Sequence, residues 1–426
     1  AVRAELPGGV RIVVVRDTTR AVVSARAVWP GGTGLERAAT AGLTRLLSES
    51  WTAGCGKRDG TEVASALERT EAAMWGVAGR DSIELAAEWP LSSWRAGLAL
   101  MADCALAPRF AAAAVDRARR RLLVERAARE RSAEESAWQL LVGALFADGP
   151  YGADPLGTDE SLAALDRGAV AAHFAAAYPA GAMAIAVVGD VDPDAVVAAA
   201  RQAFGAARAG GPAAAAPGGS PPAPSGERQL FGFLPGEVSA VAIGFPGVAV
   251  DHPDRAGLDV LAEVLAARLG AKLRLERRLV HRVSAMSIEG ARGGFIAVAI
   301  ACRADRTAGA AAALRAEIDR LKSSGPTGDE LVRAVRALRQ RDREPAGDRL
   351  AAALASAEAL GTAGAAPRRR AALGRMRLAD LAGLAARALA WDAAVVATVM
   401  PPRASPEAAR RARGSVRRAV KRRSRR

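Results

Sequence analysis

Three polar residues on one predicted helix have the types and the spacing that could carry chemistry. Residues 42–50 read Gly-Leu-Thr-Arg-Leu-Leu-Ser-Glu-Ser, so Arg45, Ser48 and Glu49 share a helix face at i, i+3 and i+4. An arginine cannot ligate a metal ion, and a serine cannot replace a carboxylate as a general base. The segment therefore predicts a polar helix face without a catalytic centre of its own.

The same segment resembles the zinc-site helix of the insulinase/pitrilysin peptidases, which reads Gly-Leu-x-His-Leu-Leu-Glu-His. In that family the two His bind one Zn²⁺ and the Glu activates the metal-bound water. The resemblance places Arg45 and Glu49 at the two ligand positions and Ser48 at the position of the base. It implies a family member that has lost its catalytic residues and binds no metal, with zinc expected in a partner subunit.

Further segments support the resemblance by their order and spacing from about residue 5 to about residue 400. The family's third zinc ligand is a Glu on a charged helix, and Glu125 lies 76 residues after Glu49 on such a helix. The strings that follow match the family's Pro-Tyr-Gly turn and the stretch that closes its first domain: Gly149-Pro150-Tyr151-Gly152, Leu156-Gly157-Thr158, His173-Phe174, Tyr178-Pro179 and Val187-Val188-Gly189-Asp190.

Two interpretations apply to Glu49 and Glu125. Two carboxylates without imidazole can hold Ca²⁺ or Mg²⁺ loosely. Alternatively, Arg45 stands where zinc would be and forms an ion-pair cluster with both, since a guanidinium suits carboxylates. We favour the ion-pair cluster and predict that Arg45 lies within ion-pair reach of Glu49 or Glu125.

A second motif points to substrate contact. Residues 273–283 resemble the family's Leu-Arg-x-x-x-Gly-Leu-x-Tyr-x-Val, in which the Arg and the Tyr help to hold substrate. The resemblance assigns Arg274 and His281 as substrate-binding residues, with Arg278 at the Gly position. The alternative for His281 is a surface imidazole in a basic loop. His173 and His252 are interpreted as structural, and the sequence contains no Ser/His/Asp signature or phosphate loop.

Charge, cysteines and apolar runs restrict the function classes. Of the net charge of +15, ten positive charges lie between Arg410 and Arg426, so the rest of the chain carries only about +5. We expect no specific nucleic-acid partner, because no recognition motif accompanies this tail. The three cysteines, Cys55, Cys104 and Cys302, are predicted to be ordinary thiols. No apolar run has the length of a membrane span.

The two halves of the chain share a sequence pattern. In each half a Val lies 18 residues before an Ala-Gly-Leu, at Val23 and Ala41 and again at Val238 and Ala256, which suggests duplication. We predict domains at residues 1–208 and 229–402, a flexible Pro/Gly/Ala linker at 209–228 and a disordered basic tail at 403–426. The start at Ala1 without Met suggests that a signal peptide or another N-terminal segment has been removed, which favours a periplasmic or otherwise exported protein.

The sequence of each half predicts strands of a sheet followed by long helices. The chain is therefore expected to contain two domains of the α+β layer class. The resemblance implies that the two halves together form half of a clamshell. The predicted strands are residues 10–15, 22–29, 83–89, 183–188, 238–245 and 295–301, and the predicted helices are residues 61–70, 92–105, 113–131, 134–147, 194–204, 255–267, 306–322 and 327–341.

The resemblance implies a non-catalytic subunit of a zinc metallopeptidase that supports peptide binding and proteolysis by an intact sister subunit in a heterodimer. Contacts remote from the reacting bond can assist chemistry elsewhere. Two alternatives stay open: a stand-alone peptide-binding or scaffold protein, and an active hydrolase with a rearranged metal site.

Overall fold

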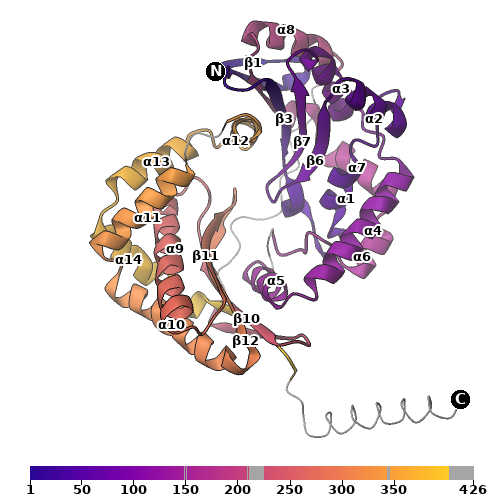
Figure 1. Cartoon of the computed structure of the whole chain (residues 1–426). Helices are drawn as coiled ribbons and strands as arrows, with labels where there is room; N and C mark the ends of the chain where they lie inside the picture. The colour runs from indigo at the N-terminus through magenta and orange to yellow at the C-terminus, as the bar shows by residue number, and fades with distance from the viewer. Residues whose placement is uncertain (148, 150, 209, 211–224, 343–345, 403–426) are drawn as a thin grey trace, which may run out of the picture.

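The first half of the chain is built on a six-stranded mixed sheet (Figure 1). The computed structural model describes residues 1–147, 149, 151–208, 210, 225–342 and 346–402. The strand order is β1-β2-β8-β3-β7-β6, and only β2 and β8 run parallel. The strands are β1 (Val2–Glu5), β2 (Arg11–Arg16), β3 (Val22–Pro30), β6 (Ala73–Ala78), β7 (Ser82–Pro90) and β8 (Ala184–Gly189).

Helices from the same half pack on one face of this sheet and enclose an aromatic core. Trp51 and Phe174 lie at its centre, with ring centroids 5.5 Å apart, and Trp29 and Phe110 pack against them. His173 is mostly buried beside Tyr178, which agrees with a structural role. The helices of this half are α1 (Leu43–Ser50), α2 (Gly60–Arg69), α3 (Trp94–Leu106), α4 (Ala112–Arg129), α5 (Ala133–Leu145), α6 (Asp159–Ala164), α7 (Arg167–Ala177) and α8 (Pro193–Ala203).

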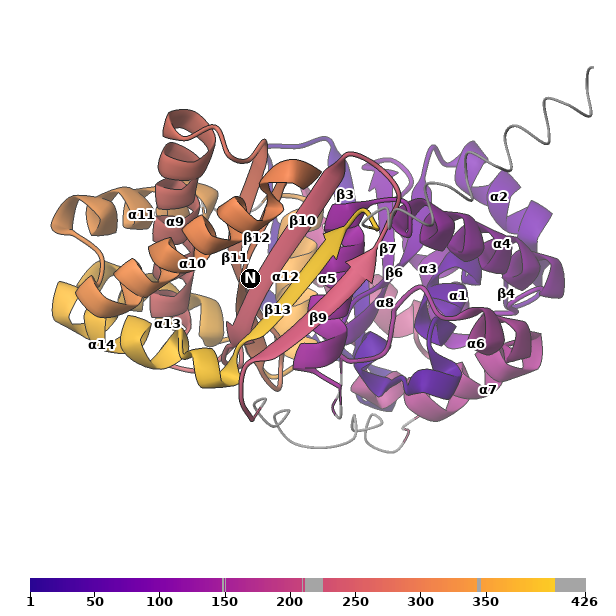
Figure 2. The ribbon, with the colours of Figure 1, turned by 90° about the horizontal axis from the view of Figure 1, so that it is seen from below.

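The second half repeats the plan on a five-stranded sheet with the order β11-β12-β10-β13-β9. Figure 2 shows β10, β13 and β9 of this sheet side by side. Its strands are β9 (Arg228–Phe233), β10 (Val238–Pro246), β11 (Arg282–Glu289), β12 (Gly294–Arg303) and β13 (Val395–Met400). Its helices are α9 (Arg255–Leu269), α10 (Thr307–Ser324), α11 (Gly328–Arg341), α12 (Asp348–Ala359), α13 (Ala365–Arg375) and α14 (Leu378–Ala388).

The two halves exchange one helix each. Helix α5 belongs to the first half, but Leu141 and Leu145 pack on the second sheet, so close that a Cβ added at Gly244 would lie 2.9 Å from Leu145. Helix α12 belongs to the second half, but its alanines pack against Val28 and Val188 of the first sheet. Each sheet is therefore covered on one face by its own helices and on the other by a helix from the opposite half.

The structure confirms the predicted α+β class and the strands and helices expected from periodicity. The predicted linker lies outside the described residues at 209 and 211–224, and so does the tail at 403–426. Among the helices that the structure describes, none is both long and apolar enough to cross a bilayer.

The prediction of three ordinary thiols is wrong. Cys55 and Cys104 form a disulfide across a sequence separation of 49 residues, with their Cα atoms 4.6 Å apart. The two residues meet because a short strand at Gly54–Cys55 lies against the end of α3, a contact that their spacing in the chain does not reveal. Cys302 remains a free, buried thiol on β12.

Candidate functional site

The N-terminus of helix α1, the helix that carries Arg45, Ser48 and Glu49, is capped by a side chain from outside the helix. Gly42 adopts a left-handed conformation (φ 90°), and the buried carboxylate of Glu36 accepts hydrogen bonds from the N–H groups of Gly42 (3.0 Å) and Thr44 (2.6 Å). Glu36 therefore caps the helix from a distant position, in place of a residue at the N-cap itself. Burial raises the pKa of Glu36 to about 7, although both hydrogen bonds act in the opposite direction.

An ion-pair cluster occupies the exposed face of α1 where it packs against α4. The Arg45 guanidinium lies 3.2 Å from Glu49 Oε1 and 2.8 Å from Glu125 Oε2, and Arg121 approaches the other oxygen of Glu49 at 3.1 Å. The predicted pairing of Arg45 is thus confirmed. Two guanidinium groups neutralise two carboxylates, so this surface has no excess negative charge with which to attract a cation.

Ser48 cannot act as a base in this arrangement. It is buried, and its hydroxyl donates a hydrogen bond to the Arg45 carbonyl at 3.0 Å. The strand β6 passes directly beside Ser48. The approach is so close that a Cβ added at Gly76 would lie 2.2 Å from the Ser48 carbonyl oxygen. The absence of a side chain at Gly76 therefore lets the edge of the first sheet lie against the polar helix.

The residues at this site do not fit zinc. Zinc in peptidases is held by imidazole and carboxylate ligands in a compact set, whereas here a guanidinium lies between the two carboxylates. Across the part of the chain that the structure describes, no group of three or more His, Cys, Asp and Glu side chains is arranged to hold a metal ion.

The two predicted substrate-binding residues lie in the second half. Arg274 lies on a π-helical extension of α9 (Gly270–Glu276), and His281 just precedes β11. Both are exposed, and no hydrogen bond or ion pair among the described residues joins them to the Arg45 cluster. Arg278 has φ 49°, the left-handed conformation that suits the Gly of the related motif better than an arginine.

A buried ion-pair cluster that the sequence did not reveal joins β3, β7 and α12. Arg26 on β3 contacts Glu84 at 3.1 Å and Asp348 at 2.6 Å, and its guanidinium lies 5.4 Å from the ring centroid of Trp75 on β6. The only sequence signal was an arginine within a strand of buried apolar residues. Asp348 lies 322 residues away, so the partner could not be identified from local spacing.

Comparison with known proteins identifies the family. The profile of the family described as Peptidase M16 inactive domain matches residues 164–338. An uncharacterized zinc protease of Mycobacterium leprae is 30% identical over 321 residues, covering 72% of this chain and 70% of the relative. The chain belongs to the M16 peptidase family, the pitrilysin/insulinase-like family that the sequence resembles.

Solved structures show the same fold. The peptidase M16 inactive domain from Pseudomonas fluorescens superposes with a TM-score of 0.86 at 20% identity, covering 94% of this chain and 98% of that one. The periplasmic protease PqqL from Escherichia coli superposes with a TM-score of 0.75 at 17% identity, and the match covers 96% of this chain but 49% of PqqL.

Proposed function

We propose that this chain is a non-catalytic subunit that binds peptide for an active M16 sister subunit. The observation that carries the proposal is the Arg45 cluster, in which a guanidinium occupies the space between Glu49 and Glu125 while the surrounding family fold persists. A chain without metal ligands or a base contributes to proteolysis only through binding and positioning. In the proposed assembly it forms half of a clamshell, and zinc belongs to the sister.

The edge of the first sheet supports peptide binding. Strand β6 pairs with β7 alone among the described strands, so its other edge has backbone groups available for an added strand. Extended peptides bind such edges through main-chain hydrogen bonds. Because β6 lies against α1, a peptide added there would run beside the Arg45 cluster, which replaces a catalytic centre in this family.

Arg274 and His281 are proposed as further peptide contacts. Both side chains are exposed, and no ion pair involving either is present in the described structure. An exposed guanidinium can donate to a peptide carbonyl or carboxylate without breaking an existing contact. We expect Arg274→Ala to weaken peptide capture without changing the melting temperature, whereas Arg277→Ala, at an exposed neighbouring position, serves as the matched control.

The proposed compartment is the periplasm or another exported location. Two observations support it: the fold matches a protease named as periplasmic, and the chain contains the Cys55–Cys104 disulfide. Disulfides persist in oxidising compartments and are rare in the cytosol. Cell fractionation with thiol labelling tests this, since a cytosolic chain with both thiols reduced would contradict it.

The partnership is tested by co-expression with an M16 homologue that retains His-x-x-Glu-His. Peptide cleavage is measured with this chain alone, with the homologue alone and with both together. We expect no cleavage by this chain alone, co-purification of the two chains, and faster cleavage by the complex than by the homologue. A homologue that is fully active alone and never co-purifies would reject the partnership and favour a stand-alone peptide-binding protein.

A further inference from the structure

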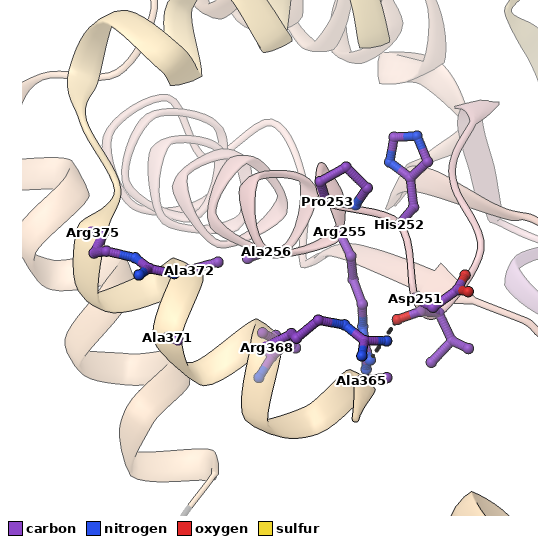
Figure 3. A pocket seen from close by; sticks show the side chains of 12 residues that line it. Asp251, His252, Pro253, Arg255, Ala256, Ala365, Arg368, Ala371, Ala372 and Arg375 are labelled. Carbon is purple, nitrogen blue, oxygen red and sulfur yellow. Dashed lines mark hydrogen bonds between the residues drawn. The ribbon is translucent and has the colours of Figure 1, made fainter. Parts of the chain in front are cut away.

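A basic hollow lies in the second half, away from both groups of residues discussed above. It has a volume of about 380 Å³ and lies between the loop at residues 250–253, the first turn of α9 and helix α13. Figure 3 shows Asp251 and His252 on the loop side, with Arg368 and Arg375 on the facing helix. Nothing in the proposed peptide-binding role uses this hollow.

Arginine dominates the charged lining of the hollow. Arg255, Arg368, Arg369 and Arg375 all line it, whereas Asp251 is the one carboxylate in the lining. Arg255 begins α9, and the other three arginines lie on α13, more than 100 residues further along the chain. Their convergence is therefore a property of the tertiary structure and not of one basic helix face.

Two of the four arginines are already neutralised and form the inner wall. Arg369 contacts Asp259 at 2.5 Å and also pairs with Asp342, and Arg255 pairs with Glu289. The Arg255 side chain is only 16% exposed, and its buried Nε has no hydrogen-bond partner among the described residues. The inner wall is thus a fixed array of guanidinium groups whose charges are already paired.

The other two arginines have no partner of their own in the described structure. Arg368 and Arg375 are exposed and form no ion pair there. They lie seven residues apart on one helix, two turns or about 10 Å along its axis, so both project from the same face. His252, which also lines the hollow, accepts a hydrogen bond at Nδ1 from the N–H of Asp254 (3.1 Å).

We propose that this hollow binds a small anion with more than one phosphate group, of the pyrophosphate class. Guanidinium groups bind phosphate oxygens in a bidentate geometry, and two long, unpaired guanidinium side chains on one helix face can each engage one phosphate of a linked pair. The α9 N-terminus adds positive potential, because no side chain caps it and Asp254 pairs instead with Arg387 at 3.3 Å.

The test is titration calorimetry of the full chain with inorganic pyrophosphate at constant ionic strength. We expect Arg368→Ala and Arg375→Ala each to weaken binding about tenfold, since each removes a charge-assisted contact, and the double variant to lose specific binding. Arg370→Ala is the matched control, because Arg370 is an exposed arginine on the same helix that does not line the hollow. Circular dichroism of each variant confirms that it is folded.

The basic C-terminal tail also attracts anions, but it is the same in every variant. The quantity compared is therefore the pyrophosphate affinity of each variant relative to that of Arg370→Ala. Equal losses in Arg370→Ala and Arg368→Ala would overturn the proposal, because binding would then follow net charge alone. Citrate tests the chemical class: binding as tight as that of pyrophosphate would overturn phosphate selectivity. None of these results depends on a peptidase partner, so they are separable from the proposed function.

Discussion

Arg26→Met tests the helix exchange between the halves. The Arg26 side chain is 9% exposed and pairs with Glu84 and with Asp348 at the start of α12, the helix that the second half contributes to the first sheet. The substitution keeps the apolar stem but leaves two partly buried carboxylates without a counter-charge. Removing one partner of a buried ion pair typically costs about 3–5 kcal/mol of unfolding free energy.

The size of the shift in melting temperature tells how much of the chain unfolds together. With an unfolding entropy near 2.1 cal/mol/K per residue, a loss of about 4 kcal/mol lowers Tm by about 5 °C for a unit of about 400 residues and by about 10 °C for one of about 200. Because each half holds a helix against the other's sheet, we expect a single calorimetric transition and the smaller shift.

Arg3→Met is the matched control, since Arg3 also reaches α12, through Glu358 at 2.7 Å, but is 57% exposed. Exposed pairs contribute less than about 1 kcal/mol, so Tm should fall by no more than about 1 °C on the same scale. Asp348→Asn completes a double-mutant cycle with Arg26→Met, in which the two losses should be strongly non-additive. An Arg26→Met shift no larger than that of Arg3→Met, or additive losses in the cycle, would refute the reasoning.

Three further predictions concern the site and its neighbours. Because the pKa of Glu36 is raised from 4.5 to about 7, its protonated form stabilises the fold, and this contribution of about 3 kcal/mol is present below pH 4.5 and lost as the pH rises through 7. Glu36→Gln should therefore flatten the fall in Tm between pH 5 and pH 7.5, and an unchanged slope would show that another group causes it. The combined substitution Arg45→His, Ser48→Glu and Glu49→His should bind about one zinc per chain by elemental analysis, because the third carboxylate already lies within 2.8 Å of the Arg45 side chain; no bound zinc would show that the frame has diverged. Arg278→Gly should raise stability by about 0.5–1 kcal/mol in thermal melts, since φ 49° is strained for an arginine, and a fall in Tm would mean that its side chain contributes more than the strain costs.

Local patterns in the sequence predicted most of the elements and the character of the site. The alternation in β3 and the 3.6-residue period in α11 depend on neighbours within a few residues, so both elements could be predicted from the sequence alone. The substitution of the family's metal-binding and base residue types at Arg45, Ser48 and Glu49 is read directly from the sequence and needs no coordinates. The sequence did not predict every element: those not predicted include helices α6, α7, α12, α13 and α14 and strands β1, β6, β9, β11 and β13.

What the sequence by itself determined, then, is where most of the long helices and the central strands lie, and that residues of other types stand at the family's catalytic positions. Only the tertiary structure decided that α5 and α12 cross to the opposite sheets, that Cys55 meets Cys104, and that Arg26 meets Asp348. It also decided that Arg255 converges with the arginines of α13. The physical reason is the same in each case: these contacts join residues far apart in the chain, and their partners are set by how whole layers bury apolar surface, which no local period encodes.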